Sequence, residues 1–69
     1  MRIKYIYEFY DQVPFRAKAV LETEQPLNLN VGDELNMSEL ASRPLTIHKV
    51  EHFLMTQGGV VVCRTCIHC

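Results

Sequence analysis

The last third of the chain, residues 45–65, constrains the fold most, because it holds two apolar runs joined by a glycine turn. The first run extends from Leu45 to Leu54 and the second from Val60 to Cys63. Both are rich in β-branched residues, which favour strands. The connecting segment ends in Gly58-Gly59, a pair that tolerates the positive φ angles of a tight hairpin turn. This stretch therefore predicts a β-hairpin against which the other strands are laid.

Two strands are predicted in the first 24 residues. Residues 2–10 alternate in polarity and place on one face Ile3, Tyr5, Tyr7 and Phe9. The opposite face is half apolar through Ile6 and Tyr10, so we expect cover on both sides, from the fold itself or from a neighbouring subunit. Asp11 to Pro14 predicts a turn. Residues 15–24 contain good helix formers, but their period of two favours a second strand that pairs with the first.

The middle of the chain predicts short elements. Gly32 is expected in a left-handed conformation, with Asp33 bonding back to the local backbone at the start of a strand over 33–37. Residues 36–42 are expected to form one helical turn that ends at Pro44. Within the run 45–54, the apolar parity changes near His48 and Lys49, and this predicts a β-bulge there.

Five strands are thus expected, at about 2–10, 15–24, 33–37, 45–54 and 60–66, mostly antiparallel. This pattern predicts an all-β fold, a small five-stranded and partly open barrel with at most one helical turn. Residues 1–66 are predicted as a single domain and residues 67–69 as a C-terminal tail. A chain of 69 residues buries only about 60% of the surface that its unfolded form exposes, so a metal, a disulfide or a partner chain has to be considered as additional support.

A family resemblance follows from three features: the element Asn-Val-Gly-Asp-Glu-Leu at 30–35, a strand with the pattern Ile47-x-x-Val50-x-His52, and a closing valine-rich arm. Together they resemble small uncharacterised bacterial and phage-borne β-barrel proteins of the SH3-like type. The resemblance implies an SH3-like barrel and carries no function with it.

Charge and hydropathy exclude several classes. The chain has seven Lys and Arg and eight Asp and Glu, for a net charge of −1. Proteins that bind nucleic acid through its phosphates usually have an excess of basic residues, which this chain lacks. Charged residues interrupt the region behind Met1, so no signal peptide is predicted. No apolar stretch approaches the roughly 18 residues of a membrane span. The expected location is the cytoplasm.

The C-terminus carries the main chemical signal, since Cys63, Cys66 and Cys69 are spaced as Cys-x2-Cys-x2-Cys. Thiolates are zinc ligands, and His52 on the facing hairpin arm is the best fourth ligand, so a zinc-binding module is one hypothesis. The alternative is that Cys63 packs as a small core residue and the other two lie on the tail. A thioredoxin-like redox role is disfavoured, because no strand-to-helix context surrounds the pair of cysteines.

No catalytic constellation is predicted. His48 and His52 lie four apart, but the expected bulge would separate them. The hydroxyl residues have no neighbouring base in the sequence, and Asp33-Glu34 is explained by its turn. We therefore expect a protein without enzymatic activity and without a cofactor.

The aromatic N-terminal strand gives the remaining lead, through Tyr5, Tyr7, Phe9 and Tyr10. As a stacking platform it would bind single-stranded nucleic acid, which the absence of a basic surplus makes the lesser hypothesis. As an interface it would bind a protein, since its apolar side chains exceed what a small barrel can hide. The sequence thus favours a protein-interaction or assembly module with an unknown protein partner, and it leaves a homodimer open.

Overall fold

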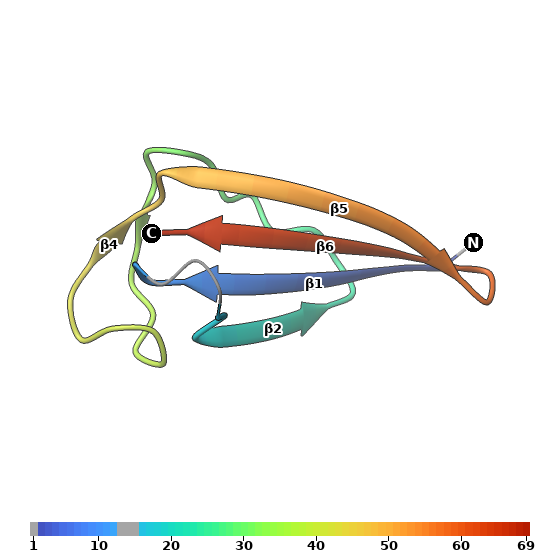
Figure 1. Cartoon of the computed structure of the whole chain (residues 1–69), viewed down its shortest axis with the longest axis horizontal. Coiled ribbons are helices and arrows are strands. Elements are labelled where there is room, and N and C mark those ends of the chain that lie inside the picture. The colour runs from blue at the N-terminus through green and yellow to red at the C-terminus, as the bar shows by residue number, and fades with distance from the viewer. Residues whose placement is uncertain (1, 13–15) are drawn as a thin grey trace.

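The computed structural model describes residues 2–12 and 16–69, and all regular structure in them is β-strand. Figure 1 shows how the strands are arranged. In chain order they are β1 (Arg2–Tyr10), β2 (Ala19–Thr23), β3 (Glu34–Leu35), β4 (Leu45–Thr46), β5 (Lys49–Gln57) and β6 (Val60–His68). The predicted all-β class is therefore confirmed.

A four-stranded sheet with the order β2-β1-β6-β5 forms the body of the protein. β1 pairs antiparallel with β2, as predicted, and β5 pairs antiparallel with β6. The two central strands, β1 and β6, run parallel, with Arg2 beside Val60 and Tyr10 beside His68. β3 and β4 form a separate two-stranded antiparallel sheet. Most pairings are thus antiparallel, as expected, and the exception joins the two ends of the chain.

The predicted hairpin is confirmed as β5 and β6. Gln57 pairs with Val60 across a two-residue turn, in which Gly58 has a φ of 56° and Gly59 a φ of 80°. Two consecutive positive φ angles are the signature of a type I′ turn, which matches the twist of the flanking strands.

The turn before β3 is also as predicted. Gly32 has a φ of 95°, and Asp33 Oδ2 accepts a hydrogen bond from the Asn30 N–H at 2.9 Å. The expected helical turn in 36–42 is a single turn, in which the N–H groups of Leu40 and Ala41 both donate to the Met37 carbonyl at 3.0 Å.

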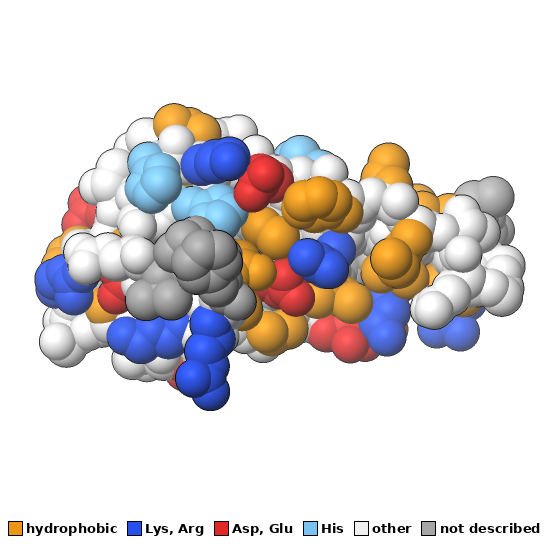
Figure 2. Space-filling model, viewed as in Figure 1, with side chains coloured by type: hydrophobic (Ala, Val, Ile, Leu, Met, Phe, Trp, Pro, Cys, Tyr) orange, Lys and Arg blue, Asp and Glu red, His pale blue; other side chains and the backbone are white. Residues whose placement is uncertain are grey.

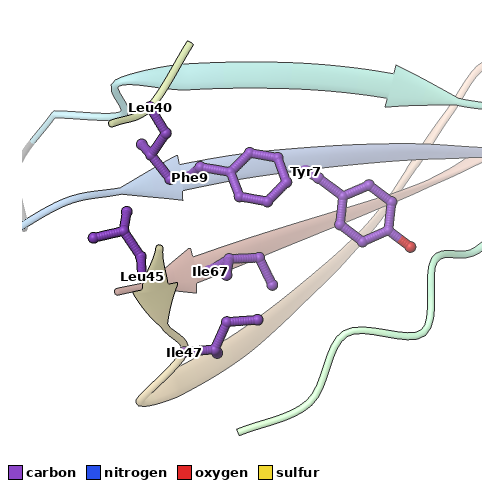
Figure 3. Packing of buried hydrophobic residues seen from close by; sticks show 6 residues of the cluster. All are labelled: Tyr7, Phe9, Leu40, Leu45, Ile47 and Ile67. Carbon is purple, nitrogen blue, oxygen red and sulfur yellow. The ribbon is translucent and has the colours of Figure 1, made fainter. Parts of the chain in front are cut away.

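The core lies on one side of the sheet, which we call the covered face. Tyr7, Phe9 and Ile67 project from β1 and β6 toward side chains of the segment that leads to β5. Figure 3 shows these side chains pointing toward one another, the partners from that segment being Leu40, Leu45 and Ile47. The cover does not reach the hairpin end, where Ile3 and Leu54 of the same face are exposed. The molecule is accordingly elongated, with extents of 39 × 23 × 19 Å, and the hairpin projects at one end (Figure 1).

The predicted SH3-like barrel is not confirmed. Within the described residues the strands form one open sheet and one small ribbon and do not close. The predicted strand 45–54 is two strands, because the chain leaves the small sheet after Thr46 and enters the large one at Lys49. This change of sheet, and no bulge, accounts for the change of parity, since the pairing of β5 with β6 is uninterrupted.

The domain boundary at residue 66 was wrong. β6 continues to His68, and Ile67 is fully buried in the core. Residues 67–69 are therefore part of the fold and not a tail. The predicted strand 15–24 is shorter, Ala19–Thr23, and the predicted turn at 11–14 lies partly outside the described residues. In the described part of the chain, no helix is long and apolar enough to cross a membrane.

Candidate functional site

The side of the sheet opposite the core, which we call the open face, carries a group of polar and titratable side chains that bond to one another. Strand alternation places even-numbered residues of β1 and β6 on this face, and the register sets Glu8 beside Cys66 and Ile6 beside Arg64. Figure 2 shows this face, on which histidine and charged side chains gather at one end and apolar side chains appear between charged ones toward the hairpin.

A hydrogen-bonded cluster occupies the middle of the open face, around the Glu8 carboxylate. Glu8 Oε1 accepts a hydrogen bond from the Tyr10 hydroxyl at 3.0 Å and from the Cys66 thiol at 3.5 Å. Arg64 Nε lies 3.1 Å from the same oxygen. We call these four residues the Glu8 cluster. Two of its members, Glu8 and Tyr10, come from β1, and the other two, Arg64 and Cys66, come from β6. The cluster therefore links these two parallel strands through their side chains.

The electrostatics of the cluster follow from its partial burial. Loss of solvent around the phenol, aided by the hydrogen bond to Glu8, raises the pKa of Tyr10 to about 12. The pKa of Arg64 is raised by its hydrogen bond to Cys66 and by the nearby carboxylate of Glu8. Both groups therefore keep their protons at neutral pH, and the cluster consists of donors around one acceptor.

A second polar pair adjoins the cluster. His68 Nε2 lies 2.8 Å from Glu51 Oε1, and this contact is the main reason that the pKa of Glu51 is lowered. The His68 ring stacks on Tyr10 with centroids 4.8 Å apart, so the pair and the Glu8 cluster form one continuous surface.

The arrangement presents no accessible nucleophile beside a base, since the Thr65 hydroxyl, which lies 3.1 Å from His52 Nδ1, belongs to a residue that is only 2% exposed. The Cys66 side chain is only 4% exposed, and its thiol donates to a carboxylate that two other donors already occupy. Among residues 2–12 and 16–69, no hydrogen bond joins a cysteine to a histidine. The cluster is thus built to fix side chains in place, since each polar group has a partner.

The four predicted zinc ligands do not converge. Cys63 and Cys66 lie on opposite faces of β6, and His52 contacts Thr65, with Nδ1 3.1 Å from Oγ1. Cys69 returns to the side of Cys63, but six residue steps along the strand separate them by roughly 20 Å. No group of three or more His, Cys, Asp or Glu in the described chain is placed to hold a metal ion. The three thiols are free, and burial raises the pKa of Cys69.

The four predicted interaction residues are divided between the faces. Tyr7 and Phe9 are core residues, and Tyr5 packs against them, so these three do not form the exposed surface that was predicted for them. The Tyr7 hydroxyl accepts a hydrogen bond from the Leu27 N–H at 2.7 Å, which ties the chain segment after β2 to the sheet. Tyr10 alone lies on the open face. The same burial removes the stacking platform proposed for nucleic acid.

The longest run of exposed apolar side chains in the described residues lies instead on β5, where sequence reasoning did not place it, and a shorter run lies at Val20 and Leu21 of β2. Three consecutive side chains are exposed: Phe53 at 46%, Leu54 at 73% and Met55 at 52%. We call them the hairpin patch. Arg64 adjoins it, with its guanidinium carbon 5.2 Å from the centre of the Phe53 ring. The signal in the sequence is that consecutive apolar residues in a strand project to both faces, so a fold that covers one face must expose some of them.

A groove of about 540 Å³ lies near the hairpin end of the sheet and is lined by residues of β1, β2, β5 and β6. Arg2, Lys4, Glu22 and Gln57 contribute to its lining, and Lys4 and Glu22 pair across it at 3.2 Å. Its charges are of mixed sign and exposed, so the groove shows no preference for one class of ligand.

No protein-family model, curated protein or solved structure matches this chain. The resemblance to SH3-like barrels therefore stays a prediction, and a function has to be inferred from the geometry of the chain itself.

Proposed function

We propose that this chain is a non-enzymatic protein-interaction module whose contact surface is the hairpin patch. The observation that carries the proposal is the exposure of three successive residues of β5, with Phe53 and Met55 on the open face and Leu54 on the opposite one. Single exposed apolar residues are ordinary on protein surfaces, whereas adjoining ones commonly mark a contact with another molecule.

The chemistry around the patch supports a protein as the bound molecule. Aromatic, methionine and arginine side chains are enriched at protein interfaces, and Phe53 with Arg64 over its ring supplies such a pair. Arg64 is in turn held by Glu8 at 3.1 Å. In this proposal the Glu8 cluster has a positioning role: it fixes the arginine beside the patch before a partner arrives, which reduces the side-chain entropy lost on binding.

Site-specific photo-crosslinking in the cells that make the protein tests the proposal. A photoreactive amino acid replaces Met55 in one variant and Val31 in the other. Val31 is a matched control, because it is exposed to 63% and lies in the turn before β3 and not on β5. We expect discrete protein adducts from position 55 that are missing from position 31. Adducts of equal pattern and yield from both positions, or none from position 55, would overturn the proposal.

A further inference from the structure

The two edges of the four-stranded sheet differ in how they are protected against pairing with another strand. β2 also exposes the apolar residues Val20 and Leu21, but it is an edge of only five residues, with Glu22 bonded to Lys4 on its flank. β5 is an edge of nine residues, and from Phe53 to Gln57 it has no charge and no proline. Its register is free of bulges. Natural edge strands are usually protected by charges, proline, bulges or short length, so this half of β5 is suited to pair with another strand.

The hairpin patch faces both sides of the sheet, and this limits what can cover it. Phe53 and Met55 project on the open face, whereas Leu54 shares the face of Cys63 and Tyr5. A partner that packed on one face would leave the other part exposed. A strand added along the edge contacts both faces at once, because its own side chains alternate in the same way.

We propose that the partner is a second copy of this chain, paired through β5 in an antiparallel arrangement about a twofold axis at Leu54. This inference rests on the proposed function and names its partner. The axis sets Leu54 opposite Leu54 and Phe53 opposite Met55. It also sets His52 opposite Thr56 and Glu51 opposite Gln57, so no like charges meet and apolar residues face apolar residues.

Neighbouring registers fit less well. An axis at Phe53 would set Glu51 opposite Met55 and would leave a carboxylate against an apolar side chain. An axis at Met55 would set Phe53 opposite Gln57. The axis at Leu54 also keeps Glu51 bonded to His68, because Glu51 stands at the rim of the overlap.

A twofold pairing of this kind closes on itself. Each copy uses its one β5 edge, and the outer edges of the resulting eight-stranded sheet are the two β2 strands with their charged flanks. Isologous contacts of this type produce dimers and not open fibres.

Sedimentation analysis of the purified chain over a wide concentration range, with the thiols kept reduced, tests the inference. We expect a monomer–dimer equilibrium. Leu54→Lys sets two ammonium groups opposite each other at the axis and should raise the dimer dissociation constant about tenfold or more. Val31→Lys is the matched control and should leave it unchanged. Circular dichroism establishes that both variants keep the sheet.

A second variant tests the register without a charge. Leu54→Cys places one thiol opposite its own copy, so mild oxidation should yield an interchain disulfide at position 54, mapped by peptide mass spectrometry. Thr56→Cys, whose partner is His52, should form such a link at position 56 far more slowly. Equal rates at the two positions would overturn the register.

The outcomes separate this inference from the proposed function. A wild-type chain that stays monomeric at all concentrations, or that associates without limit, overturns the second-copy inference. If position 55 still yields adducts with another protein, the interaction module stands and its partner is a different chain. If neither association nor adducts are found, both proposals fail.

Discussion

Ile67 gives the sharpest test of the fold, because the sequence placed it in a tail and the structure places it at the centre of the core. Its side chain is 0% exposed, and it lies between Phe9 and Val50 in the register of the sheet. Ile67→Ala removes three carbon atoms from this position. At about 0.8 kcal/mol each, the lost transfer free energy is roughly 2.4 kcal/mol. The cavity that remains raises the expected loss to about 3–4 kcal/mol.

This loss is large for so small a domain, whose free energy of unfolding is expected at roughly 3–10 kcal/mol. Urea unfolding followed by circular dichroism measures it. Ile67→Val should cost only about 1 kcal/mol, and Val31→Ala on the surface less than about 0.5 kcal/mol. If Ile67→Ala unfolds with the same midpoint as the wild type, then Ile67 is not in the core and the parallel pairing of β1 with β6 is wrong.

Three further predictions concern the polar groups and the cysteines. Glu8→Gln should lower the pKa of Tyr10 from about 12, but only part of the way to its ordinary value, because burial is the larger cause of the shift. Ultraviolet titration of tyrosinate measures this pKa. An unchanged pKa would contradict the hydrogen bond between Tyr10 and Glu8. The pKa of Glu51 is lowered in the folded chain by His68, so its contribution to stability is present above the ordinary glutamate pKa and is lost as the pH falls through the folded value. Glu51→Gln should therefore be less stable than the wild type near neutral pH and approach it on acidification, and a difference in melting temperature that is constant with pH would refute this linkage. Native mass spectrometry of reduced protein should give the mass of the chain without zinc, since Cys66 lies on the face opposite Cys63 and His52, and Cys69 lies farther along the chain. If each chain instead held one zinc ion that a chelator removed only when the protein was unfolded, the C-terminal strand would have a different course.

Local signals in the sequence predicted the local parts of the fold. The Gly58-Gly59 pair specifies its turn almost alone, because few other residues tolerate two successive positive φ angles. Gly32 and Asp33 specify their turn in the same way. The alternation of residues 2–10 predicted β1 and assigned Tyr7 and Phe9 to one face, but it did not say that this face is the one turned to the core.

The long-range parts could not be derived from such signals. Nothing in the residues of β1 indicates that it pairs with β6, nearly sixty positions away in the chain. Parallel strands are not joined by a tight hairpin turn, so the sequence contains no turn signal for this pairing. The parity change near His48 was noticed, and a bulge was the local explanation. The true cause is a change of sheet, which depends on where β3 lies in space. The Glu8 cluster was missed for the same reason, since its members become neighbours only through the parallel register.

The proposed dimer and the small size of the fold are physically connected. The segment between β2 and β4 covers only part of one sheet face, so the hairpin end contributes exposed apolar side chains and little burial to the free energy of folding. Pairing through β5 would cover that end, and a partner that binds only the folded chain stabilises it by mass action. The melting temperature of the wild type should therefore rise with protein concentration, and that of Leu54→Lys should rise only at concentrations about tenfold higher or more. A melting temperature independent of concentration in the wild type would mean that the core around Ile67 stabilises the fold alone and that the hairpin patch serves a different partner.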